Sequence, residues 1–427
     1  MFAQVGDGPL DPHIVGLGLR RDGRRRLFSG PLHGVDSSSW QRPAHPILAA
    51  CAGYCRPGLP SKLWANRGPD AFILRGSWAS SGSAERPLDS ISQAALGAAV
   101  GVAVMGRTRP VWQAALTGAI VGTLPDLDVF IDQGDPIRNM VLHRAETHAL
   151  LWQALVSPVL GLLLAVITGT RPLFGRWWLM VVLTLLTHSA LDAMTVYGTQ
   201  IALPFSNHPF GLGSLFIIDP LYTLPLLVGL IVSLVARTSY RRRWNTLGLA
   251  LSTLYAAWSV LAQTYVTTQV RQTVEARDLP AQQILVTPTP FNTLLWRVVL
   301  MSEDDYREGF YSLLDPPQRP LRFERFARGA ELDRRTVGLG GSDDIRAFSK
   351  GFYALIDDGR FIRITDLRMG QHPYFVFSFA FAEHHSEPLL PIEPFQVSQR
   401  MPLAPGLRWL WARLRGQDEP ISRSEEI

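Results

Sequence analysis

Long apolar stretches dominate the middle of the chain. A helix that crosses a bilayer needs ~20 mostly apolar residues. Of six stretches, the third, fifth and sixth meet this length, and the second and fourth meet it if their polar ends lie at the interface. The first is short and rich in small residues. The pattern predicts an α-helical polytopic membrane bundle of about five to six helices. The stretches are residues 92–105, 111–131, 150–168, 177–194, 215–236 and 246–266.

Residues after the apolar region show shorter periods, typical of a water-soluble domain. Phenylalanine recurs at every second position from 375 to 381, which is the period of a half-buried strand. Asp358-Gly359 separates two apolar runs and predicts a hairpin. Residues 296–301 predict another strand, and 304–314 a short helix. We therefore predict a small α+β extramembrane domain over residues 269–400, with a tail over residues 401–427.

The N-terminal region lacks such patterns. Residues 1–87 are rich in Gly, Pro, Ser and Arg, without a sustained helical or strand period. They are either disordered or an extension beyond the natural start of the chain. The only cysteines, Cys51 and Cys55, lie here, so the sequence predicts neither a disulfide framework nor a cysteine-based metal site.

Composition and charge agree with a membrane protein. Charged residues make up 18% of the chain, whereas soluble domains usually carry about 25%. Arginines cluster between stretches one and two, three and four, and five and six. The positive-inside rule makes those loops cytoplasmic, which places loops 132–149 and 195–214 and everything after residue 266 at the outer face. The soluble domain shows no basic face interleaved with aromatic residues, so the sequence does not favour nucleic-acid binding.

Carboxylates and imidazoles lie at the ends of the apolar stretches, where charge is costly and is commonly functional. His188 and Asp192 are four residues apart within the fourth stretch, so both project from one helix face. This is a common arrangement of metal ligands. A buried structural hydrogen bond between the two side chains is the alternative.

Two further pairs flank the loop before the third stretch. Asp126 and Asp128 follow Pro125, and because residues two apart do not share a helix face, both reach one site only if the helix loosens there. His143 and His148 lie just before the third stretch. Helix capping, solvation or a place at the membrane interface is the alternative role for these four residues.

The predicted orientation brings all these groups to one face of the membrane. Carboxylate and imidazole ligands suit a divalent ion such as zinc, with manganese as the alternative. Glu146 and Asp219 are candidates for a general base, and Arg144 for steadying an anionic phosphate. The predicted metal ligands are Asp126, Asp128, His143, His148, His188 and Asp192.

A series of motifs resembles the YdjM-type family of inner-membrane metal-dependent hydrolases. The resemblance covers about residues 88–270 and implies a metal-binding membrane domain similar to zinc-dependent phospholipase C, with the six ligands named above. Many members carry Asp-x-x-Thr-His near the start, where this chain has Asp89 and Gln93. The motifs are, in order, Asp89-Ser-Ile-Ser-Gln-Ala-Ala-Leu-Gly97, Gly122-Thr-Leu-Pro-Asp-Leu-Asp128, His143-Arg-Ala-Glu-Thr-His148, His188-Ser-Ala-Leu-Asp192, Pro204-Phe-Ser206 and Phe216-Ile-Ile-Asp-Pro-Leu-Tyr222.

These observations lead to one hypothesis with two rivals. The hypothesis is a membrane-bound hydrolase that uses one or two divalent ions to activate water against a phosphoester or lipid-type substrate, at the outer face of the inner membrane. Membrane lipids are then its expected partners, and the C-terminal domain is periplasmic. The rivals are a metal-stabilised membrane scaffold without catalysis and an ion- or proton-coupled transporter.

Overall fold

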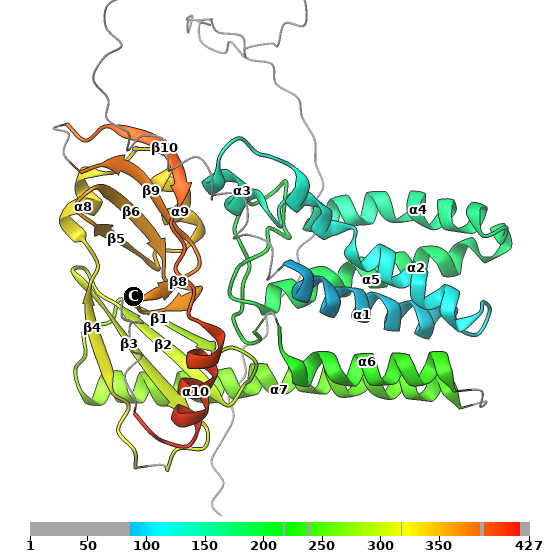
Figure 1. The fold of residues 1–427 in the computed structure, drawn as a ribbon. Coiled ribbons are helices and arrows are strands. Elements are labelled where there is room, and N and C mark those ends of the chain that lie inside the picture. Colours follow the sequence, from blue (N-terminus) through cyan, green and yellow to red (C-terminus); the bar gives the residue numbers. More distant parts are fainter. Residues whose placement is uncertain (1–85, 217, 237–239, 317, 385–387, 419–427) are drawn as a thin grey trace, which may run out of the picture. The chain divides into compact units, whose positions relative to one another are not determined.

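The computed structural model describes residues 86–418, apart from residues 217, 237–239, 317 and 385–387 (Figure 1). These residues belong to one compact unit, residues 74–427. The prediction for residues 1–87 falls almost wholly outside the described residues, and so do Cys51 and Cys55.

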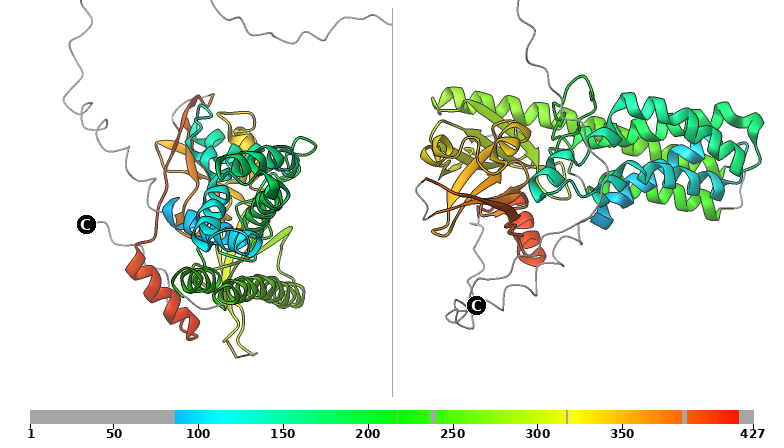
Figure 2. Two further views of the ribbon diagram at one scale, coloured as in Figure 1. Left: turned by 90° about the vertical axis from the view of Figure 1, so that its right-hand side faces the viewer. Right: turned by 90° about the horizontal axis from the view of Figure 1, so that it is seen from above.

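Helices come first along the described chain, and the longer ones run side by side (Figures 1 and 2). Helices α1 and α2 approach closely because glycine faces glycine: a Cβ on Gly97 would lie 2.4 Å from the carbonyl oxygen of Gly118. The helices are α1 (Arg86–Met105), α2 (Val111–Thr123), α3 (Pro136–Leu142), α4 (Leu150–Ile167), α5 (Phe174–Met194), α6 (Pro220–Val235) and α7 (Arg241–Ala276), with 3-10 turns η2 (Pro125–Phe130), η3 (Glu146–His148) and η4 (Arg171–Leu173).

The prediction of a polytopic bundle of five to six helices is wrong. Only two helical segments of the described chain are long and apolar enough to cross a membrane, Leu150–Ile167 and Arg171–Met194. The second apolar stretch is interrupted, since α2 ends at Thr123 and Pro125 begins a 3-10 turn. The apolar helix α6 and the apolar part of α1 are too short. The structure is a helical region followed by a distinct β-sheet domain.

The β-sheet domain contains two four-stranded antiparallel sheets, with strand orders β1-β2-β3-β4 and β10-β9-β6-β5, and the hairpin β7-β8. Helices α8 (Ala330–Arg335) and α9 (Ser342–Phe348) lie between the sheets in sequence, and α10 (Leu403–Leu414) follows the last strand. The strands are β1 (Gln283–Pro288), β2 (Leu295–Met301), β3 (Asp305–Ser312), β4 (Phe323–Ala327), β5 (Tyr353–Asp357), β6 (Phe361–Asp366), β7 (Gly370–Gln371), β8 (Tyr374–Phe375), β9 (Ser378–Glu383) and β10 (Pro391–Gln396).

Local predictions within this domain had mixed outcomes. The predicted strand at 296–301 is confirmed as part of β2. The hairpin at Asp358-Gly359 is confirmed: the Asp358 side chain accepts hydrogen bonds from the backbone N–H groups of Arg360 and Phe361, and Gly359 has φ +84°. The predicted helix at 304–314 is wrong, because these residues form β3 between β2 and β4. Pairing on both edges outweighed a local helical pattern.

Two helices of the helical region pack into the β-sheet domain. Ile137 and Met140 of α3 share a buried cluster with Phe379 of β9. Val266 of α7 shares another with Trp296 of β2. The expected domain boundary between residues 268 and 269 therefore falls inside the continuous helix α7.

Candidate metal centre

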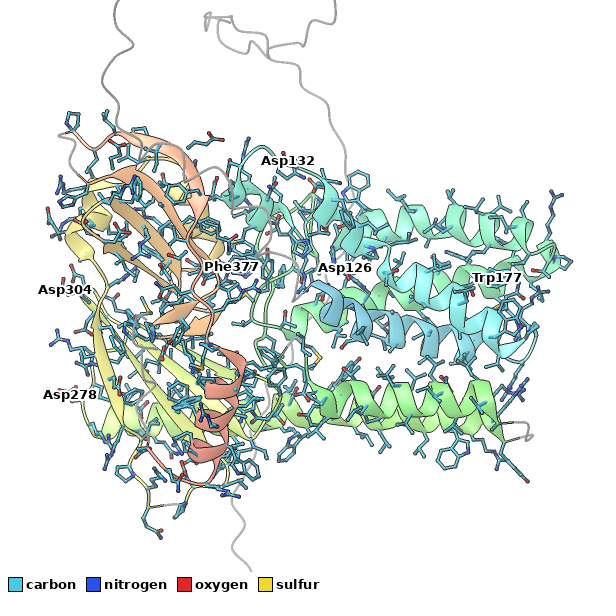
Figure 3. All side chains as sticks on the ribbon, viewed as in Figure 1. Asp126, Asp132, Trp177, Asp278, Asp304 and Phe377 are labelled. Carbon is cyan, nitrogen blue, oxygen red and sulfur yellow. The ribbon has the colours of Figure 1, made fainter. Side chains whose placement is uncertain are left out.

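Four acidic and imidazole side chains meet in the helical region. Asp126 of η2, His148 of η3, and His188 and Asp192 of α5 each offer one ligand atom, and these atoms lie within 4.8 Å of one another. Asp126 is half-buried and the other three are buried. Figure 3 shows Asp126 at one end of the parallel helices, with Trp177 toward the other. This group of four could bind a metal ion.

Local structure explains how the four groups meet. His188 and Asp192 lie one helical turn apart, with Nε2 of His188 3.3 Å from Oδ2 of Asp192, so their predicted common face is confirmed. Pro125 opens the 3-10 turn that follows α2. That turn places Oδ1 of Asp126 3.4 Å from Nε2 of His188. The helix does loosen at Pro125, which was the condition for both carboxylates to reach one site, but only Asp126 belongs to the group of four.

Five of the six distances between the ligand atoms are close to the edge length of a coordination tetrahedron, and the sixth, between the two carboxylates, is within 4.8 Å. The Nε2 atoms of His148 and His188 lie 3.0 Å apart. Oδ1 of Asp126 is 3.5 and 3.4 Å from them, and Oδ2 of Asp192 is 3.1 and 3.3 Å from them. Zinc bonds of about 2.0–2.1 Å to nitrogen and oxygen place tetrahedral neighbours about 3.3 Å apart. The donor set and its spacing therefore fit a four-coordinate divalent ion.

Hydrogen bonds fix the tautomer of both histidines. Nδ1 of His188 donates to the carbonyl oxygen of Gly122 at 2.7 Å, since a carbonyl only accepts. The Thr147 hydroxyl donates its proton to Oδ2 of Asp128 at 2.8 Å, so it can only accept from Nδ1 of His148, also at 2.8 Å. In its neutral form each ring then directs an Nε2 lone pair inward. Two lone pairs 3.0 Å apart repel unless a cation or proton lies between them.

Unsatisfied oxygens lie in the same group. Oδ2 of Asp126 and Oδ2 of Asp192 are buried and have no hydrogen-bond partner among the described residues. Oδ2 of Asp192 lies only 3.1 Å from Nε2 of His148, so a proton on that nitrogen or a cation bound to both atoms is needed to relieve the repulsion between their lone pairs. A buried carboxylate oxygen without a partner is costly, and a bound cation removes that cost.

Asp128 and His143 pair with one another beside the four-residue group. Oδ1 of Asp128 is 2.8 Å from Nδ1 of His143, and its Oδ2 also accepts the backbone N–H of Arg144 at 3.0 Å. Burial alone would raise the pKa of Asp128, but the hydrogen bond and charge of His143 outweigh it and lower that pKa. Asp128 therefore holds the loop that carries His148. A direct metal bond to Asp128 or His143 stays a prediction.

Oδ1 of Asp192, the oxygen that does not face the histidines, contacts two long side chains. Nε2 of Gln93 donates to Oδ1 at 2.9 Å, and Nη2 of Arg144 lies 3.3 Å from it. Arg144 is 1% exposed and adopts φ 64°, a left-handed backbone conformation that is unusual for arginine. The structure thus pairs Arg144 with a carboxylate, and Oδ2 of Asp192 is left to face the histidines.

The two candidate bases lie in different surroundings. Glu146 is exposed at the start of η3, two residues before His148. Asp219 is buried and caps α6, where it accepts hydrogen bonds from the backbone N–H of Leu221 at 2.9 Å and from the Tyr255 hydroxyl at 2.8 Å. Burial raises the pKa of Asp219. The structure does not bring Asp219 together with the four-residue group.

Sequence reasoning missed the supporting roles of several polar residues. Gln93 and Thr147 lie within the quoted motifs, but nothing in the sequence showed that they contact Asp192 and Asp128. Ser189, next to His188, donates to the carbonyl oxygen of His148 at 3.1 Å and accepts from Gln153 at 2.8 Å. A polar side chain next to a predicted ligand inside an apolar stretch was the available signal.

The fold and the site together define a protein with a helical region, which holds two candidate spans and a buried His/Asp group at one end of them, followed by a β-sheet domain. Residues 88–266 match the family model described as YdjM inner membrane protein. All residues of the candidate centre lie within it. No curated protein and no solved structure gives a significant match to the chain.

Proposed function

We propose that this protein is a metal-dependent hydrolase of the inner membrane, with Asp126, His148, His188 and Asp192 as the ligands of a divalent ion. The observation that carries the proposal is the pair of Nε2 atoms 3.0 Å apart, each with its Nδ1 proton committed elsewhere. Zinc is the first choice because it takes imidazole and carboxylate ligands at tetrahedral spacing, and manganese is the second. A divalent ion there would supply Lewis acidity for attack on a phosphoester.

The other residues position these ligands. Arg144 and Gln93 hold Asp192, while Asp128 holds His148 through Thr147. Such partners orient ligands and tune their basicity. Glu146 is the better candidate for the general base, since Asp219 has both oxygens committed to the cap of α6 and to Tyr255.

The two candidate spans support a periplasmic site. Arg171 and Arg176 lie at the connection between α4 and α5, and the positive-inside rule favours the cytoplasm for such a connection. His148, just before α4, and Asp192, near the end of α5, then lie on the opposite side. The β-sheet domain, which packs against α3, would share that side.

A phosphoester carried by a lipid is the substrate class that fits best. The centre lies at the ends of the two candidate spans, and α4 is largely exposed along its length. A long exposed apolar helix beside the centre favours a substrate held in the bilayer over a freely diffusing one. Membrane lipids would then be both the surroundings and the source of the substrate.

Metal content tests the centre. The protein is purified in detergent and analysed for zinc and manganese, with His188→Gln as the test variant and His208→Gln, an exposed histidine, as the control. We expect the parent and the control to retain stoichiometric metal and His188→Gln to lose it. Equal metal content in all three proteins would refute the assignment.

One observation favours a second candidate, a metal-stabilised scaffold. Four protein ligands can close a tetrahedral shell, as in structural zinc sites. Release of phosphate from a panel of lipid phosphoesters, measured with and without a chelator, separates the two. Metal-dependent release that His188→Gln abolishes supports the hydrolase. Bound metal without release by any lipid, with chelation lowering only the melting temperature, supports the scaffold.

A further inference from the structure

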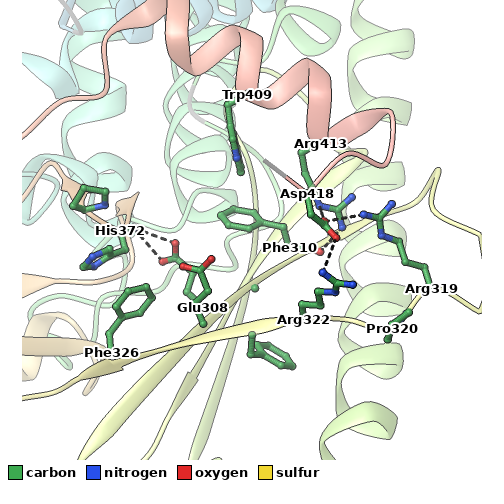
Figure 4. A pocket seen from close by; sticks show the side chains of 14 residues that line it. Glu308, Phe310, Arg319, Pro320, Arg322, Phe326, His372, Trp409, Arg413 and Asp418 are labelled. Atoms are coloured by element: carbon green, nitrogen blue, oxygen red, sulfur yellow. Dashed lines mark hydrogen bonds and ion pairs between the residues drawn. The ribbon is translucent and has the colours of Figure 1, made fainter. Parts of the chain in front are cut away.

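A cavity of about 550 Å³ lies in the β-sheet domain between the first sheet and α10. Cavities of about 300–1,000 Å³ are typical of small-molecule sites. Its walls come from β3, β4, the loop before β4 and α10, with His372 and Pro373 beside them. Figure 4 shows Trp409 of α10 pointing toward Phe310 of β3 across this space. The cavity is remote in sequence from the candidate metal centre.

Three arginines converge on one carboxylate at one end of the cavity (Figure 4). Asp418 lies 2.7 Å from Nη2 of Arg319, 3.6 Å from Nε of Arg413 and 3.7 Å from Nη1 of Arg322. Guanidinium groups match the geometry of carboxylates, phosphates and sulfonates. The arrangement is therefore an anion site that a side chain of the same protein occupies.

Two of the arginines are held in place without Asp418. Arg413 is 8% exposed at its side chain, lies 2.8 Å from Asp315 and donates to the carbonyl oxygen of Phe310 at 2.7 Å. Arg319 also lies near Asp315, at 3.3 Å. Asp418 itself is 39% exposed, and Arg322 is 78% exposed. Exposed ion pairs of this kind are weak, so an incoming anion can displace the Asp418 carboxylate.

The rest of the cavity is lined by aromatic side chains, and its far end holds a carboxylate that an arginine outside the cavity neutralises. The rings of Phe310 and Trp409 pack edge to face with centroids 4.8 Å apart, and Phe326 stacks on His372 at 3.9 Å. Glu308 lies at that far end, where it pairs with Arg297. A ligand with one anionic group would therefore place that group among the arginines and its apolar body along the aromatic wall.

We propose that this cavity binds a small amphiphilic anion, an aromatic or short acyl group carrying one phosphate, sulfonate or carboxylate, and that Asp418 occupies the place of the anionic group. The site is independent of the proposed metal centre. It explains why three arginines and a row of aromatic side chains share one cavity.

Calorimetric titration of the full-length protein in a nonionic detergent tests this site. The probe is naphthalene-2-sulfonate, which a phosphoesterase cannot hydrolyse, with inorganic sulfate and 2-naphthol as half-probes. We expect the sulfonate to bind more tightly than either half-probe. Asp418→Asn should tighten its binding by up to about fivefold, because the competing carboxylate is removed. Arg319→Gln should weaken it by about tenfold.

The exposed side chain of Arg322 provides a variant that leaves the packing intact. Arg322→Gln should weaken binding, while Arg271→Gln, an exposed arginine of α7 outside the cavity, should leave it unchanged. Equal affinity for the sulfonate and sulfate would overturn the amphiphile. Unchanged affinity in both Asp418→Asn and Arg322→Gln would overturn the site.

Discussion

Thr147 offers the sharpest test of the candidate metal centre. Its hydroxyl joins Asp128 to Nδ1 of His148 and so fixes the tautomer that directs Nε2 of His148 inward. Thr147→Val keeps the shape of the side chain and removes both hydrogen bonds. The ring of His148 is then free to move its proton to Nε2, and that tautomer cannot bind a metal ion through Nε2.

The size of the effect follows from what the substitution leaves in place. Asp128 keeps its contacts with His143 and the backbone N–H of Arg144, so its carboxylate stays paired and the loop stays folded. Losing a partner that orients a metal-binding histidine typically weakens metal affinity about 10–100-fold. That corresponds to about 1.4–2.8 kcal/mol of binding free energy.

Competition with a chromogenic chelator measures this difference. Thr147→Ser restores a hydroxyl and should recover most of the affinity. Thr253→Val, which removes an exposed hydroxyl on α7, is the matched control and should bind metal like the parent. Parent-like affinity in Thr147→Val would refute the tautomer reasoning, since the hydroxyl would then have no role in the site.

Three further predictions concern stability. Arg144→Met leaves the buried Asp192 without its cation, so the free energy of unfolding should fall by about 3–5 kcal/mol in denaturant titrations, whereas the exposed Arg138→Met should change little. Gly97→Ala puts a Cβ 2.4 Å from a backbone oxygen of α2 and should lower the free energy of unfolding by about 1–3 kcal/mol. Gly175→Ala, with open space around it, should be neutral or stabilising. Equal melting temperatures for the two variants would contradict close α1–α2 packing. Asp219→Asn keeps the helix cap but removes a carboxyl whose pKa is raised by burial. The parent should therefore lose stability relative to this variant as pH rises from the ordinary aspartate pKa through the raised one, and parallel melting curves across that window would refute the shift.

The site was more predictable from sequence than the fold around it. His188 and Asp192 were placed together by helix periodicity, which depends only on local geometry. Asp126 and His148 were predicted to lie close together because the positive-inside rule placed the polar ends of their apolar stretches at the same face of the membrane. The partners of each side chain did not follow, because Asp128 and His148 differ in role through hydrogen-bond directions that only tertiary structure sets.

The fold prediction failed where the length of apolar stretches was taken as the length of helices. Residues 111–131 look like one span, yet Pro125 separates α2 from a 3-10 turn. Residues 215–236 look like another, but the helix begins only at Pro220. Residues 304–314 form a strand because β2 and β4 pair with both edges, which no local pattern reveals.

Helix α3 ties the chemistry of the protein to its later half. Ile137 and Met140 are 0% and 5% exposed because the β-sheet domain covers them. If the chain were cut after residue 266, residues 88–266 would expose these two side chains to water. The β-sheet domain would then no longer hold in place the loop that ends at His148. We therefore expect residues 88–266 not to fold on their own, and amide exchange in α3 to rise and fall with that in β9.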